Sequence, residues 1–224
     1  MSPITHGLLS WIAGDLLLKP VGPNAPSSAR IARQRDLLGI SLAGILADLD
    51  GMGIVFDSYN SLVANPATDY YTAGHHVVLH GIFGCIVMAS LAWLISSTRS
   101  IQIFALGLAS AHLHLLCDLL GSRGAGSDEI WPIVYGGPWS QWGELQWAGQ
   151  WRLDSWQNVS ITITCLAWCF HKTWKSDCSP LELISTRAHQ AVYRTLRSRF
   201  GEPKQFKGKE KDRGSKRGAE NEQP

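Results

Sequence analysis

The chain has 224 residues, of which 45% are hydrophobic and 17% charged, and its formal net charge is +2. The apolar fraction is too high for a disordered protein, and five cysteines are too few, and odd in number, for a disulfide scaffold. The near-neutral net charge conceals a division, because residues 1–186 carry a net charge of −4 and residues 187–224 carry +6.

Five hydrophobic segments follow one another along the chain. We expect helices at residues 7–18, 36–47, 77–95, 101–121 and 156–170. The third and fourth are each about 20 residues long, the length needed to cross a hydrocarbon core of about 30 Å. The shorter segments could be half-spans, re-entrant segments or buried helices. We therefore predict an all-α membrane helical bundle of four to five hydrophobic helices, with a soluble helical bundle as the alternative.

Charge alternates between the segments that join these helices. Residues 19–35, Arg99 and everything after Phe170 are basic, whereas the loops 48–76 and 121–155 lean acidic. This alternation is what the positive-inside rule expects of a protein with several membrane spans. It predicts an integral protein of the plasma or inner membrane with its basic C-terminal tail in the cytoplasm.

The C-terminal part of the chain differs in composition from the rest. We divide the sequence into a membrane domain (1–175), a basic amphipathic juxtamembrane segment (176–200) and a disordered basic tail (201–224). The tail has only Phe206 as a large apolar residue, so it cannot bury enough surface to fold. It is either a solubilising tail or a contact for anionic lipid, and a nucleic-acid partner is not expected.

Histidines and aspartates gather in four short stretches of the first 118 residues. These are His6, Asp48-Leu49-Asp50, His75-His76 with His80, and His112 with His114 and Asp118. His114 and Asp118 are four residues apart and share a helical face, whereas His112 lies on the other side. If 77–95 and 101–121 form an antiparallel hairpin, His80 lies level with His114 and Asp118, at the end away from the turn. We expect the four stretches to meet at that end.

Imidazole and carboxylate groups together are suited to Zn, Mn or Fe(II). A carboxylate in an apolar helix, such as Asp118, costs several kcal/mol without a partner or a metal. The alternative is that these side chains only hydrogen-bond one another. One metal ion, or two about 3.5–4 Å apart, would lower the pKa of a bound water and hold the oxygens of an ester.

Four motifs occur in order along the chain. They are Thr5-His6, Ala47-Asp48-Leu49-Asp50, Gly74-His75-His76 through His80-Gly81, and His114-Leu-Leu-Cys-Asp118 followed by Trp131-Pro132. Their order and spacing resemble the YdjM-like family of membrane-bound metal-dependent hydrolases over about residues 1–175. The resemblance implies the metal ligands His6, Asp48, His75, His80, His114 and Asp118. It makes Asp50 a further ligand or a base that orients water, and it puts His76 where the family motif has arginine.

Together these patterns predict a metal-dependent hydrolase that cleaves an ester or phosphoester of a lipid or membrane-associated small molecule. Zn is the expected metal, with Mn or Fe as alternatives and one or two ions bound. Asp50 and His112 are the predicted catalytic residues, although His112 could equally be a packed histidine. His76 and Trp131 are the predicted substrate contacts. The alternative is a non-enzymatic integral membrane protein with a structural or ion-handling His/Asp site.

Six tryptophans lie within residues 131–156. Such density beside a membrane helix is typical of an interfacial aromatic belt. A wall or lid over the metal site that grips the substrate is the other interpretation.

Overall fold

The computed structural model describes residues 1–203 except 23–24, 64, 125, 127–128 and 141. Residues 204–224, which make up most of the predicted disordered tail, lie outside the described residues. The protein is mostly helical. In chain order the elements are α1 (Pro3–Leu17), α2 (Ser27–Ala43), the 3-10 helix η1 (Leu46–Met52), α3 (Gly53–Leu62), α4 (Tyr70–Gly74), α5 (Ile82–Ile95), α6 (Ile101–Gly121), β1 (Ile133–Val134), β2 (Glu144–Leu145), α7 (Trp156–Ser176), η2 (Pro180–Leu183) and α8 (Thr186–Phe200).

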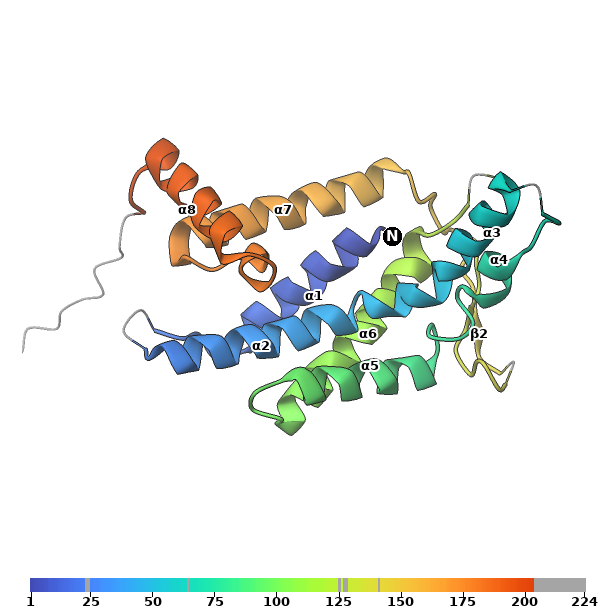
Figure 1. Ribbon diagram of the computed structural model, residues 1–224, viewed down its shortest axis with the longest axis horizontal. Helices are drawn as coiled ribbons and strands as arrows, with labels where there is room; N and C mark the ends of the chain where they lie inside the picture. Colours follow the sequence, from blue (N-terminus) through green and yellow to red (C-terminus); the bar gives the residue numbers. More distant parts are fainter. Residues whose placement is uncertain (23–24, 64, 125, 127–128, 141, 204–224) are drawn as a thin grey trace, which may run out of the picture.

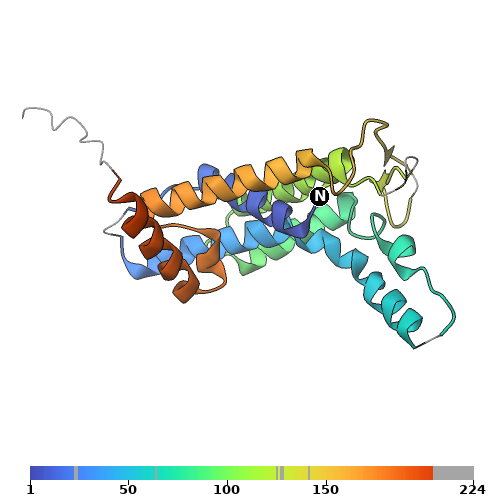
Figure 2. The same cartoon turned by 90° about the horizontal axis from the view of Figure 1, so that it is seen from above.

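The long helices form an elongated bundle (Figure 1). α2 packs against α1, α5 and α6, while α5 packs along α6 and α7 along α1. Figure 2 shows α3 projecting from one end of the bundle, where α4 and the short β1–β2 hairpin also lie. We call this the α3 end, and the opposite end, where α8 lies against α7, the α8 end.

A close approach of backbones holds α2 against α5. A Cβ atom added to Gly39 would lie 2.7 Å from the carbonyl oxygen of Ala92. Small residues at such crossings let helices pack through their backbones, a common device in membrane bundles. Around this crossing the buried core is apolar and includes Trp11, Leu37 and Ile103.

Side-chain hydrogen bonds fix the turn between α5 and α6. Asp36 accepts hydrogen bonds from the Ser96 hydroxyl (2.6 Å) and the Ser97 amide (3.1 Å). The Ser100 hydroxyl then accepts from the Ile103 amide and caps the start of α6. The antiparallel hairpin considered for the segments 77–95 and 101–121 therefore forms, with α5 packed along α6.

Not all of the four to five predicted hydrophobic helices are long and apolar enough to cross a membrane. Among the described helices, α6 alone is long and apolar enough to cross a membrane by itself. α2 and the segment Leu46–Leu62, which comprises η1 and α3, pass the same test only as a pair bent by 43°. α5 is apolar but has 14 residues. α7 has 21 residues, yet polar side chains such as Gln157, Asn158 and Lys172 lower its hydropathy.

Two segments differ from the elements expected from the sequence. Residues 77–81 are not helical, and α5 begins only at Ile82. The reason is Asp50, whose carboxylate binds the Leu79 amide and so holds this backbone in a loop around itself. The segment 48–76 was expected to be a loop. It contains most of η1, which begins at Leu46, and all of α3 and α4.

Candidate metal centre

Four separate segments bring histidine and aspartate side chains together at the α3 end. Two adjacent sets each offer ligand atoms that lie within 4.8 Å of one another. One set is His6, Asp48, His114 and Asp118, and the other is His75, His76 and His80. We call the two sets together the His/Asp cluster. All of its residues come from the four stretches that the sequence predicted to meet.

A break in the helical backbone orients the ring of His114. α2 ends at Ala43, which leaves the carbonyl of Gly44 free, and Nδ1 of His114 donates a hydrogen bond to it (2.9 Å). A Cβ atom on residue 44 would lie 1.8 Å from the Ser10 hydroxyl oxygen, so glycine is needed where α1 passes. Because Nδ1 carries the proton, Nε2 of His114 presents a lone pair to the cluster.

The ring of His80 is oriented in the same way by a carboxylate. Its Nδ1 donates to Asp50 Oδ2 at 2.9 Å, so its Nε2 is also directed into the cluster as an acceptor. Asp50 also binds Nδ1 of His75 (2.9 Å) and the amide of Leu79 (3.0 Å). Asp50 was predicted as a catalytic residue. In the structure both of its carboxylate oxygens accept hydrogen bonds, and two of the donors are the Nδ1 atoms of His75 and His80. Asp50 therefore orients these two rings from the side opposite their Nε2 atoms.

The two oriented rings face one another with Nε2 atoms 3.0 Å apart. Two lone pairs at this distance repel unless a cation lies between them. A metal ion removes the repulsion, and so does a proton held on His80. Burial opposes that proton, but hydrogen bonds to Asp118 and Asp50 outweigh burial and raise the pKa of His80 to about 9.

Carboxylate oxygens also converge on the two Nε2 atoms, although a shared proton needs only one donor and one acceptor. Asp118 Oδ2 lies 3.1 Å from Nε2 of His114 and 3.4 Å from Nε2 of His80, and Asp48 Oδ1 lies 3.6 Å and 3.9 Å from the same atoms. Ligands bound at 2.0–2.2 Å to one tetrahedral ion are about 3.3–3.6 Å apart. The spacing of this set therefore suits a divalent transition metal.

Further polar atoms of the cluster lack partners. His6 Nδ1, Asp48 Oδ2 and His76 Nδ1 are buried and make no hydrogen bond within the described part of the chain. Nε2 of His6 contacts Asp118 Oδ1 at 3.1 Å, and the N-terminal ammonium of Met1 contacts the same oxygen. Buried polar groups without partners are costly, and a bound ion or water molecule commonly satisfies them. The residues present therefore fit a metal ion.

His76 is held in an unusual backbone conformation. Its φ is 66°, in the left-handed region that a non-glycine residue adopts at a cost, and the residue is buried. Nε2 of His76 lies 3.8 Å from Asp118 Oδ2. Burial lowers the pKa of His76 to about 2, helped by the neighbouring His80, so this ring is neutral at neutral pH. Strain of this kind is concentrated at functional sites.

Aromatic rings cover the histidine side of the cluster. The Trp131 ring lies 5.2 Å from that of His76 and 5.5 Å from that of His75, and Tyr71 stacks on His75 at 4.9 Å. Gln150 fixes this cover, because its side chain accepts from the Trp131 amide and donates to the Asp118 carbonyl, each at 3.0 Å. The sequence predicted Trp131 but missed Tyr71, although Tyr71 precedes His75 by one helical turn. No local pattern marks Gln150.

His112, the other predicted catalytic residue, is not brought into the cluster. Its Nδ1 donates to the Leu108 carbonyl at 2.8 Å, and its Nε2 lies 3.0 Å from the Tyr135 hydroxyl. Two residues from His114 on a helix, it projects to the other side of α6. This placement matches the alternative given for His112 in the sequence analysis, a packed histidine with no direct part in catalysis.

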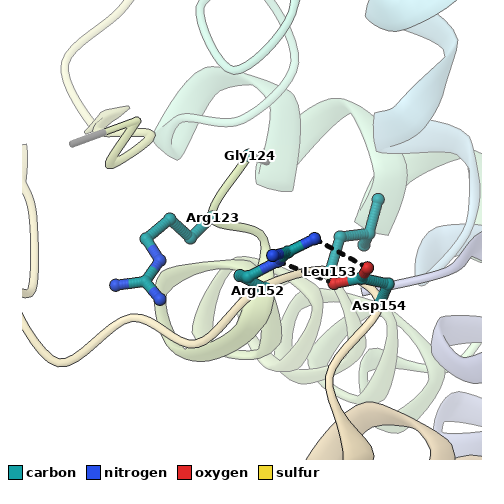
Figure 3. A pocket seen from close by; sticks show the side chains of 5 residues that line it. All are labelled: Arg123, Gly124, Arg152, Leu153 and Asp154. Atoms are coloured by element: carbon teal, nitrogen blue, oxygen red, sulfur yellow. Dashed lines mark hydrogen bonds and ion pairs between the residues drawn. The ribbon is translucent and has the colours of Figure 1, made fainter. Parts of the chain in front are cut away.

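A surface cavity of about 430 Å³ lies just beyond the end of α6 (Figure 3). Its described lining is Arg123, Gly124, Arg152, Leu153 and Asp154, and none of these belongs to the His/Asp cluster. Arg152 is already paired with Asp154 through two contacts of 2.9 Å. The cavity therefore does not coincide with the candidate metal centre.

Fold and site together define a mostly helical protein with a buried His/Asp cluster that can hold a metal ion. The chain belongs to the YdjM inner membrane protein family, whose model matches residues 1–182. This match confirms the family resemblance drawn from the four motifs. No curated protein and no solved structure matches the chain.

Proposed function

We propose that this inner membrane protein is a metal-dependent hydrolase that cleaves an ester or phosphoester of a lipid or membrane-associated substrate. The observation that carries the proposal is the pair of imidazole Nε2 atoms of His80 and His114, which lie 3.0 Å apart. Each ring donates a hydrogen bond from its Nδ1 atom, so its Nε2 atom is left as an acceptor. A proton on His80 would involve Asp118 but would leave Asp48 and His6 without a role. A divalent ion uses all of them.

The ligand set follows from the atoms that converge. His80, His114, Asp118, Asp48 and His6 would hold a first ion, and His75 and His76, which form the other set with His80, would hold a second beside it. Zn is the expected metal, and Mn or Fe(II) would accept the same nitrogen and oxygen donors. A bound divalent ion lowers the pKa of a water molecule and polarises an ester oxygen.

The chain's own residues position the substrate and the ligands. Asp50 keeps the protons of His75 and His80 on Nδ1, so that the opposite ring nitrogens stay free. His76, neutral at neutral pH, has an unpaired Nδ1 that can donate to or accept from a substrate oxygen. Trp131 and Tyr71 exclude water from one side of the cluster, which strengthens its electrostatic interactions.

An ion-handling role would require polar groups that continue through the bundle. Between the cluster and the buried ion pairs of Asp15 with Arg33 and Lys172, the described core is filled mainly by apolar residues such as Trp11 and Ile40. The buried polar side chains of Ser10, Ser41 and Ser110 add only hydroxyl groups there. The cluster is thus a site at one end of the molecule. This arrangement favours surface chemistry over transport.

The test is a panel of ester substrates assayed with purified, metal-loaded protein in detergent. It should contain aryl phosphate monoesters and diesters, carboxylic esters and phospholipids. We expect one class to be hydrolysed, with activity abolished by chelation and by His80→Ala or Asp118→Ala. His171→Ala, which changes an exposed histidine outside the cluster, should retain wild-type activity. Metal-loaded protein inactive on every class would contradict the hydrolase proposal.

A further inference from the structure

Helix α3 exposes nearly all of its apolar side chains. None of its ten residues is buried, and Ile54, Val55, Phe56, Tyr59 and Leu62 are all exposed, with Phe56 at 62% and Leu62 at 85%. Apolar surface of this extent on one projecting helix is uncommon on a protein in water and marks an interaction site. In Figure 2 this helix extends away from the bundle, so the bundle does not cover it.

The exposed helix is joined to the His/Asp cluster by a short series of contacts. Asp57 of α3 accepts hydrogen bonds from the Thr68 hydroxyl (2.6 Å) and from the amides of Tyr70 (3.1 Å) and Tyr71 (2.8 Å). These bonds tie α3 to α4, and the Tyr71 ring then stacks on His75. We call α3 and α4 together the α3–α4 hairpin. Its position fixes one wall of the candidate metal centre.

The charges and neighbours of the hairpin indicate what covers it. Residues 36–98 contain no Lys or Arg, so the surface lacks the cations that would bind a nucleic acid or an acidic protein. α2 together with η1 and α3 meets the length and hydropathy of a bent membrane span. At the same end, Trp139, Trp142 and Trp156 are strongly exposed, as tryptophans are at a membrane–water interface.

We propose that the α3–α4 hairpin is inserted into the lipid leaflet at the α3 end and holds the His/Asp cluster at the level of the lipid headgroups. Insertion removes the apolar side chains of α3 from water without requiring a protein partner. The substrate would then be an amphiphile, with its hydrocarbon part beside α3 and its ester group facing Trp131 and the cluster. This substrate class rests on the proposed function, whereas the insertion does not.

Spin labels on the full-length protein in lipid nanodiscs test the insertion. Single cysteines replace Phe56 and Leu62 in one pair of variants, and Glu144→Cys on the exposed β2 strand is the matched control. Cys178, the least buried native cysteine, is changed to serine throughout. We expect labels at 56 and 62 to collide with oxygen, which concentrates in lipid, and the label at 144 to collide with a water-soluble nickel complex.

Two results would overturn the insertion. Labels at 56 and 62 as accessible to nickel as the label at 144 would place the hairpin in water. Low accessibility to both reagents, together with efficient disulfide cross-linking through Phe56→Cys, would show that a second copy of the chain covers α3.

A second experiment tests the substrate class with a variant that removes the apolar surface. Ile54→Ser, Phe56→Ser and Leu62→Ser are combined in one protein. We expect unchanged metal content and a loss of about tenfold or more in hydrolysis of vesicle-borne phospholipid relative to a water-soluble ester, because three inserted side chains are lost. Equal loss on both substrates would overturn the amphiphile assignment. If the wild type hydrolysed neither, the proposed function would fail while the spin-label result stood.

Discussion

Single residues of the His/Asp cluster depend on hydrogen bonds made behind their ligand atoms. His114 is fixed by the Gly44 carbonyl and His80 by the Asp50 carboxylate, and both bonds keep Nε2 free for a metal. Such partners of metal ligands commonly change metal affinity by 10–100-fold when removed. The role of Asp50 follows from this arrangement, because it orients two histidines and binds a backbone amide at once.

The Asp50→Asn variant tests that role. Asparagine keeps the size of the side chain but removes the charge that holds protons on Nδ1 of His75 and His80, so we expect metal affinity to fall by about 10–100-fold. Competition with a metal-binding dye measures the affinity. Asp154→Asn, an exposed carboxylate at the same end, is the control. An unchanged affinity in Asp50→Asn would show that the rings do not depend on this carboxylate.

His112 provides the opposite case. Because its ring nitrogens are occupied by Leu108 and Tyr135, we expect His112→Asn to keep full metal content and to change activity by less than about threefold, in line with the loss of a partly buried hydrogen bond. Elemental analysis and the ester assay measure both properties. A loss of activity as deep as that of His80→Ala would restore His112 as a catalytic residue.

For single residues, the sequence predicted which side chains form the cluster better than it predicted their conformations and contacts. Spacing of four residues placed His114 and Asp118 on one face, and the hairpin placed His80 beside them. The left-handed conformation of His76 and the contact of Gln150 with Trp131 depend on tertiary structure. No local pattern announces either of them.

At the scale of elements, the site exists because regular structure is interrupted at two places. α2 breaks at Gly44 and continues as η1, which carries Asp48 and Asp50, and the segment before α5 stays unwound around Asp50. Irregular backbone is tolerated in membrane proteins where it lines a site. Apolar length in the sequence predicted the α5–α6 hairpin but not these breaks, because a break depends on partners distant in the chain.

The crossing of α2 and α5 gives a test at this scale. A Cβ atom at residue 39 would lie 2.7 Å from the Ala92 carbonyl oxygen, so Gly39→Ala forces the two backbones apart. We expect a destabilisation of about 1–3 kcal/mol, as for other overpacked sites. Thermal unfolding in detergent measures it. Gly22→Ala has no atom within 4 Å of the new Cβ and should leave stability nearly unchanged; equal effects of the two changes would contradict the close packing.

At the scale of the whole molecule, charge and chemistry are separated along the bundle. The described Lys and Arg residues lie mostly in the half toward the α8 end, in residues 19–35, at Arg99 and in residues 172–199, whereas the His/Asp cluster lies at the α3 end. The positive-inside rule then predicts a cytoplasmic α8 end. The cluster would face the other side of the inner membrane.

Labelling of engineered cysteines in intact cells tests this orientation. In a protein with Cys178 changed to serine, Glu144→Cys at the α3 end should react with a membrane-impermeant maleimide. Gln190→Cys on exposed α8 should react only after the cells are permeabilised, because the basic end faces the cytoplasm. The reverse pattern would contradict the predicted orientation and place the metal centre on the cytoplasmic face.

The His/Asp cluster is expected to hold a metal ion. Elemental mass spectrometry of the full-length protein, purified without chelators and reloaded with Zn, Mn or Fe, tests this claim most directly. We predict at least one equivalent of a divalent transition metal per chain in the wild type and in His171→Ala, and a loss of that metal in the His80→Ala, His114→Ala double variant. A wild type that retains no metal after reloading, or a double variant that retains as much as the wild type, would contradict the account.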